Sequence, residues 1–123
     1  MKKKALIIFN LLLVALLNAQ TNAPGLAWKK TFGGKKSEVA YDVIPTNDGQ
    51  IVIVGTSTSA PAKKMDGIWL LLDQNGNKIT QQYFGKEKED VIKSVIQTYD
   101  GHFVLAGYTT LDKDKGRKQG WLF

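Results

Sequence analysis

The side chains with the clearest ligand chemistry lie in one short segment. Asp73-Gln74-Asn75-Gly76-Asn77 carries oxygen donors at alternate positions, as the start of a calcium-binding loop does. The glycine, however, is fourth rather than sixth, and the twelfth residue is Phe84 where such a loop has a bidentate glutamate. We therefore predict a tight hairpin turn here, for which Asn-Gly is a strong signal.

The remaining polar candidates also have structural explanations. Asp48-Gly49 and Asp100-Gly101 are typical of turns between two strands. His102 follows the second pair at the start of a strand, so we expect a solvent-exposed side chain. The acidic residues Glu87, Glu89 and Asp90 precede another strand and are predicted to lie in a solvated loop.

Three tryptophans are candidates for a sugar-binding site, because an indole ring can stack on a sugar. Trp28, Trp69 and Trp121 each adjoin apolar residues, however, and this placement favours packing in a core.

No set of residues for catalysis can be assembled from this chain. It has no cysteine and one histidine, which excludes a disulfide scaffold, a thiolate metal site and a cysteine nucleophile. No nucleophile, base and orienting group are brought together by the sequence. We predict that the protein is not an enzyme and has no catalytic residue, cofactor or metal site. Of the formal charge of +6, Lys2, Lys3 and Lys4 contribute three, and the other basic residues form no continuous stripe, so we expect no nucleic-acid partner.

The first 19 residues have the form of a secretory signal peptide. A basic start is followed by an apolar run from Ala5 to Leu17, and the predicted cleavage follows Ala19. A membrane anchor is the alternative, but a bilayer core needs about 20 apolar residues. We therefore predict a secreted protein, extracellular, cell-surface or periplasmic, that is not inserted in the membrane after cleavage.

A repeat with a fixed period of 52 residues is the strongest pattern in the chain. Residues 32–71 align with 84–123 without a gap and give 15 identities in 40 positions. Residues 20–123 thus form a repeat region with units at about 32–83 and 84–123, the second of them truncated. The matched positions include Phe32-Gly33 with Phe84-Gly85, Gly55 with Gly107, and Trp69-Leu70 with Trp121-Leu122.

Each unit has the composition of antiparallel strands. Runs of β-branched and apolar residues are separated by turn pairs, and no helical period follows the leader. Pro45 cannot donate a ladder bond, which indicates a strand end or an unpaired side. The predicted strands are 26–32, 39–46, 50–56, 67–73, 77–84, 91–98 and 102–109, with a last strand reaching residues 121–123.

These strands predict an all-β fold built from four-stranded antiparallel blades of a β-propeller. The runs at 51–54 and 69–72 are apolar at consecutive positions, as expected for strands covered on both faces. The chain contains about two blades' worth of strands, whereas propellers close with 4 to 8 blades. We expect either further blades in a longer chain or assembly of several copies.

The repeat resembles a known family. Trp28 to Gly34, Tyr41 to Ile44, Asp48-Gly49, Val54 to Ser57 and Trp69 to Gly76 are similar to the propeller-like repeats of large secreted or cell-surface proteins of Bacteroidetes. Such proteins are often substrates of type IX secretion. The resemblance implies a propeller fold and no established activity.

Two functional hypotheses follow. The first is a non-catalytic secreted or cell-surface scaffold, a fragment of a longer protein, that binds protein or glycan partners. The second is a small oligomeric propeller lectin that binds sugars at the junctions between blades.

Overall fold

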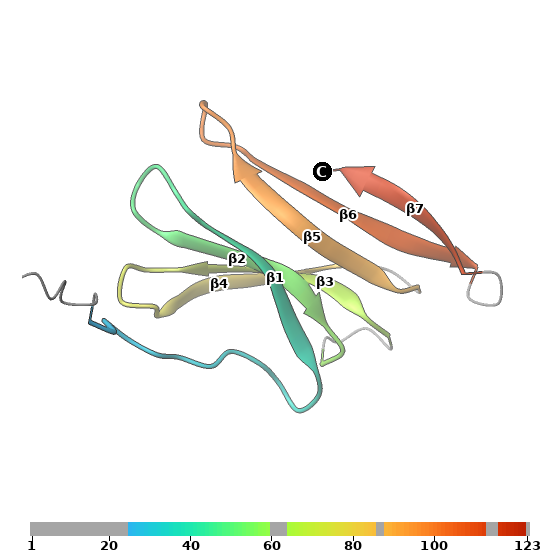
Figure 1. Ribbon diagram of the computed structural model, residues 1–123, viewed down its shortest axis with the longest axis horizontal. Coiled ribbons are helices and arrows are strands. Elements are labelled where there is room, and N and C mark those ends of the chain that lie inside the picture. Colours follow the sequence, from blue (N-terminus) through green and yellow to red (C-terminus); the bar gives the residue numbers. More distant parts are fainter. Residues whose placement is uncertain (1–24, 60–63, 86–87, 113–115, 123) are drawn as a thin grey trace, which may run out of the picture.

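The described part of the protein is built entirely from β-strands. The computed structural model describes residues 25–59, 64–85, 88–112 and 116–122, so the predicted signal peptide lies outside the described residues. Within these ranges seven strands form two antiparallel sheets and no helix is present (Figure 1). It follows that the described residues include no helix with the length and apolarity needed to cross a bilayer.

The two sheets follow one another along the chain. The four-stranded sheet has the order β1 (Glu38–Pro45), β2 (Ile51–Ser57), β3 (Asp66–Leu72) and β4 (Lys78–Phe84). The three-stranded sheet has the order β5 (Asp90–Gln97), β6 (Phe103–Asp112) and β7 (Arg117–Leu122). The predicted all-β class is thus confirmed, as are all but one of the strands. Pro45 is the last residue of β1, as its missing N–H requires.

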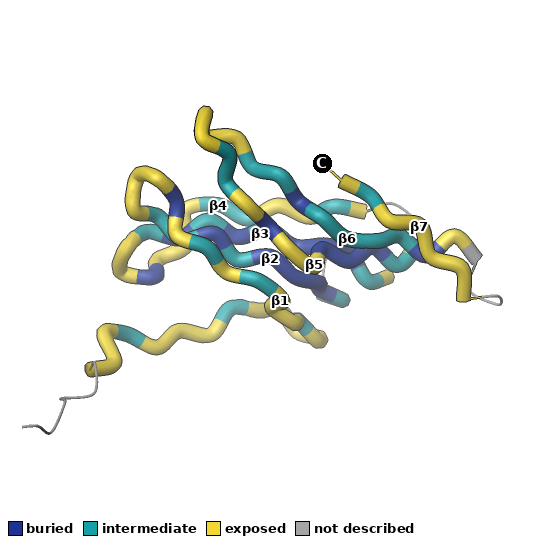
Figure 2. Tube along the Cα trace, turned by 45° about the horizontal axis from the view of Figure 1, so that its top comes forward, coloured by how far each residue is buried: buried dark blue, intermediate teal, exposed yellow. Residues whose placement is uncertain are grey.

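The core lies between the two sheets. Val52 and Val54 of β2 face Ile92, Val95 and Leu105 of the three-stranded sheet, and these five side chains are buried. Figure 2 shows this buried layer running along β2 and β3 beneath β5, with exposed residues in the turns and along β7. The sheets are held together by apolar packing of one inner face against the other.

A polar contact fixes the same junction at its edge. Asp42 lies just after a register shift in β1, and its Oδ2 accepts hydrogen bonds from Val95 N at 2.9 Å and Ser94 Oγ at 3.1 Å. The bond from the Val95 amide is the largest effect on the pKa of Asp42 and lowers it; burial opposes this, and the weaker effect of the Ser94 hydroxyl lowers the pKa further. Asp42 and Ser94 are equivalent positions of the repeat, so the contact joins matching points of the two units.

The predicted strand at 26–32 is wrong, because this segment has no strand pairing. Trp28 and Phe32 instead lie over the outer face of the four-stranded sheet, the face that points away from the three-stranded sheet. There they line a hollow of about 590 Å³ with Ile53 and Leu70. The face of a sheet presents side chains, whereas an additional strand must hydrogen-bond to the unpaired backbone N–H and C=O groups at the edge of a sheet. The segment is therefore extended but not part of a sheet.

The last strand departs from the repeat by one residue. In the first unit, Trp69 of β3 pairs with Val54 of β2. The equivalent residues 52 positions later are Trp121 and Ala106, so the repeat predicts that these two pair. Trp121 instead pairs with Gly107. A shift of one residue turns every side chain of a strand to the other face. In β7 it directs Trp121, the half-buried residue of a mostly exposed strand, toward the core between the sheets.

Candidate functional site

Two matching turns form one end of the molecule. In each, a threonine hydroxyl donates to the aspartate carboxylate two residues later, and a glycine with positive φ closes the turn, as Thr46, Asp48 and Gly49 do before β2. The two turns lie side by side, because the Asn47 amide donates to Gln97 Oε1 at 2.7 Å. The repeat thus brings two equivalent turns to one surface, which we call the turn surface (residues 46–50 and 97–102).

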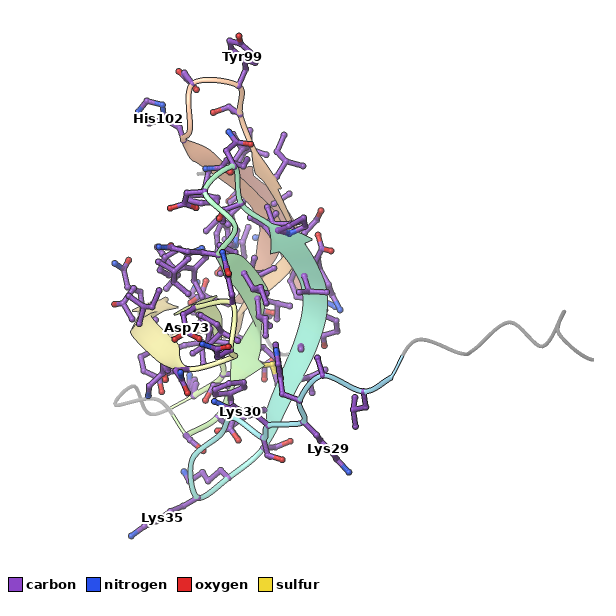
Figure 3. All side chains as sticks on the ribbon, turned by 90° about the vertical axis from the view of Figure 1, so that its left-hand side faces the viewer. Lys29, Lys30, Lys35, Asp73, Tyr99 and His102 are labelled. Atoms are coloured by element: carbon purple, nitrogen blue, oxygen red, sulfur yellow. The ribbon has the colours of Figure 1, made fainter. Side chains whose placement is uncertain are left out.

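The second turn presents side chains to solvent. Tyr99 is fully exposed, and His102 lies beside Asp100 with Nδ1 3.1 Å from Oδ2. Figure 3 shows Tyr99 and His102 projecting from the tip of this turn, far from the lysines of the amino-terminal segment. The exposed His102 confirms the sequence prediction. A phenol ring and an imidazole at a protruding turn can stack on, and hydrogen-bond to, a partner.

The calcium-like segment is a hairpin turn, as predicted. Asp73 Oδ1 accepts from the amides of Asn75 at 2.9 Å and Asn77 at 2.7 Å, and Oδ2 accepts from Asn77 Nδ2 at 2.8 Å. The amide and side chain of Asn77 hold the pKa of Asp73 below its ordinary value, with a smaller contribution from Lys30. Both carboxylate oxygens are thus used to shape the connection between β3 and β4.

The three tryptophans are half-buried, and the prediction of core packing is confirmed for Trp69 and Trp121 but wrong for Trp28, which lines the hollow on the outer face of the four-stranded sheet. Trp69 packs edge-on against Phe103 across the two sheets, with ring centroids 6.0 Å apart, and Trp121 packs against the same core. Trp28 donates from Nε1 to Gln74 O at 3.1 Å.

A buried acidic pair is the feature that the sequence analysis missed. Asp66 and Asp90 begin β3 and β5 and are 2% and 8% exposed, so the prediction of a solvated Asp90 is wrong. Both carboxylates lie against Gly85, where an added Cβ would be 2.6 Å from Asp66 Oδ1 and 2.8 Å from Asp90 Oδ2. Asp90 is drawn inward because its amide donates to Met65 O at 2.8 Å. Burial, and then the charge of Asp90, raise the pKa of Asp66.

Replacing Asp66 by asparagine is expected to stabilise the fold at neutral pH. The raised pKa means that the folded chain binds a proton at Asp66 more tightly than the unfolded chain, so the ionised carboxyl is destabilising above the folded-state pKa. This destabilisation fades as the pH falls toward the ordinary value of 3.8. We expect Asp66→Asn to raise the free energy of unfolding by on the order of 1 kcal/mol at pH 7, less near pH 4. Denaturant unfolding at both pH values measures the difference.

Asp73→Asn is the matched control, because it makes the same chemical change at a carboxylate whose pKa is lowered instead of raised. It should destabilise the chain at pH 7. If Asp66→Asn instead lowered the free energy of unfolding at pH 7, the buried Asp66 carboxylate would not be destabilised by burial and by repulsion from Asp90.

Neither the geometry nor similarity to other proteins points to a known site. Within the four described ranges, no three acidic or histidine side chains gather into a group that could hold a metal ion. Comparison with protein-family models, curated proteins and solved structures finds no match. The function must therefore be inferred from the repeat and the turn surface.

Proposed function

We propose that this protein is a non-catalytic, exported scaffold whose two sheets are consecutive blades of a β-propeller, and that it binds a protein or glycan partner through the turn surface. The proposal includes kinship with the secreted propeller-like repeats of Bacteroidetes that the sequence resembles. The observation that carries it is the stacking of two copies of one 52-residue unit, with their matching turns side by side at one end.

The arrangement of the sheets supports blades. Each copy has a bulged first strand, with the register shift at Ala40/Asp42 in one and at Ile92/Ser94 in the other. Successive antiparallel sheets that pack face to face are the building plan of propellers.

The chemistry of the turn surface supports binding rather than turnover. Asp48 and Asp100 are occupied by the neighbouring threonine hydroxyls, and these bonds are the largest cause of the lowered pKa of each carboxyl. A carboxylate held in its charged form is a poor proton donor at neutral pH. Tyr99, by contrast, offers a whole ring as a contact.

An array experiment tests this proposal. The purified chain is applied to immobilised glycans and surface-protein peptides, and mass spectrometry follows the bound compounds for chemical change. We expect saturable binding to one class of compound without turnover. Conversion of a bound compound to a product would contradict the non-catalytic role.

Tyr99→Ala is expected to weaken this binding by at least tenfold, the loss typical of an exposed aromatic contact residue. The melting temperature should change little, because Tyr99 has no buried contact. Tyr83→Ala, on edge strand β4, is the matched control and should keep the binding. Equal loss in both variants would show that the turn surface is not the binding site.

A further inference from the structure

The junction between the two sheets shows which faces of this fold fit together. The four-stranded sheet contributes Ile44, Val52 and Val54, and the three-stranded sheet contributes Val95 and Leu105. The opposite faces of both sheets are not covered by a third sheet in the described chain.

The repeat places the same two surfaces on those opposite faces. A shift of 52 residues converts Ile44, Val52 and Val54 into Ile96, Val104 and Ala106 on the outer face of the three-stranded sheet, where Ile96 is 57% exposed. The same shift in reverse converts Val95 and Leu105 into Val43 and Ile53 on the outer face of the four-stranded sheet, where Val43 is 60% exposed. The molecule thus carries both halves of its own internal junction on its two outer faces.

We propose that the outer face of the three-stranded sheet binds the outer face of the four-stranded sheet of a second copy of this chain. This head-to-tail interface rests on the proposed blade arrangement and deepens it by naming the partner. Such heterologous contacts close into a ring when the rotation between copies allows.

Charge favours a second copy of this chain as the occupant. At the internal junction the corner residues are Asp66 and Asp90, two like charges against Gly85. In the sequence repeat Lys118 corresponds to Asp66 and Glu38 to Asp90. Because β7 is shifted by one residue, Lys118 lies opposite Thr110 with its ammonium over the Tyr108 ring, on the outer face of the three-stranded sheet. Glu38 keeps the local arrangement, since a Cβ on Gly33 would lie 2.7 Å from its Oε2, as one on Gly85 lies 2.8 Å from Asp90 Oδ2. The two outer faces therefore carry opposite charges, Lys118 on one and Glu38 on the other.

The amino-terminal segment fits the same interface. Residues 26–32 are equivalent to β4, the fourth strand of the first sheet, and β7 is the edge strand of the three-stranded sheet in the described part of the chain, where such a strand would add. On its own sheet the segment is held by side-chain bonds of Trp28 and Lys30, above the hollow of about 590 Å³. Its movement onto β7 of the neighbouring copy would uncover the face that docks. Once a second copy covers the outer face of the three-stranded sheet, β7 could also shift by one residue into the register that β3 has in its own sheet. Trp121 would then turn to this outer face and be buried there.

Sedimentation velocity of the full chain over a range of concentrations, with exchange of the charges of Lys118 and Glu38, tests this interface. We expect the wild-type chain to associate, and Lys118→Glu or Glu38→Lys alone to raise the dissociation constant at least tenfold, because each sets like charges opposite one another. The double variant should return to within about threefold of wild type. Lys118→Arg is the control, since it keeps the positive charge at the same position and should associate like the wild-type chain.

Glu38 also accepts a hydrogen bond from Ser57 in its own chain, so a melting curve of each variant accompanies the measurement. If Glu38→Lys is unfolded, Lys118→Glu compared with Lys118→Arg decides the matter. A monomeric wild-type chain, or association that ignores the charge of residue 118, would overturn the head-to-tail interface. Neither result would remove binding at the turn surface, which the array measures separately.

Discussion

Gly107→Ala is expected to unfold most of the chain at 37 °C. A Cβ at this position would lie 1.9 Å from the carbonyl oxygen of Val91 in the neighbouring strand, a backbone atom that cannot rotate away. Only a shift of β5 against β6 would make room, and β5 carries the core of the junction between the sheets. We expect a loss of about 4 kcal/mol in the free energy of unfolding, at the upper end for single substitutions.

Gly120→Ala is the control for this prediction. Its Cβ would lie 3.8 Å from the nearest heavy atom, which is an ordinary contact, so the free energy of unfolding should change by less than about 1 kcal/mol. Gly55→Ala should resemble Gly107→Ala, because its Cβ would also lie 1.9 Å from a strand carbonyl oxygen, that of Val39. Equal stability of the Gly107 and Gly120 variants, measured by denaturant unfolding, would contradict the close pairing of β5 and β6.

Ile92→Ala is expected to have the second largest effect. Ile92 is completely buried between the sheets. Its side chain packs directly on Gly67 of β3, where an added Cβ would lie 2.7 Å from Ile92 Cγ1. Truncation removes buried methyl groups and leaves a cavity, for which we expect a loss of about 3 kcal/mol in the free energy of unfolding.

The same substitution at an exposed isoleucine separates burial from residue type. Ile79 of β4 is 51% exposed, so Ile79→Ala should cost less than about 1 kcal/mol. Similar losses at both positions, measured by urea unfolding of the two variants, would show that the two sheets do not form a common core.

The repeat made most of the fold predictable from the sequence. Turn pairs such as Asp48-Gly49 and Asn75-Gly76 act locally, through glycines that adopt positive φ, so their hairpins were found with nearly correct strand ends. Trp69 was expected in the core because it adjoins an apolar run, and it packs on Phe103 there.

The features that the sequence did not predict depend on contacts between elements. Residues 26–32 have the composition of a strand, but they lie over a sheet face and pair with no strand. Asp90 is buried because its amide bonds to Met65 O, and no local pattern announces that bond. The alignment of Asp90 with Glu38 at a strand start was the one available signal. That alignment places an acidic residue at the start of both strands but gives no sign that Asp66 faces Asp90.

The most direct test of the central claim, that the two copies of the unit stack face to face, is a nuclear Overhauser spectrum of the full chain. The ring centroids of Trp69 and Phe103 lie 6.0 Å apart at an angle of 66°, so ring protons of the two residues should give a cross-peak. Phe103→Leu should remove it, which assigns the signal. A sample that mixes isotope-labelled and unlabelled chains separates contacts within one chain from contacts between copies. A cross-peak within one chain is the predicted result, and a folded chain without it would contradict the stacking of the two sheets.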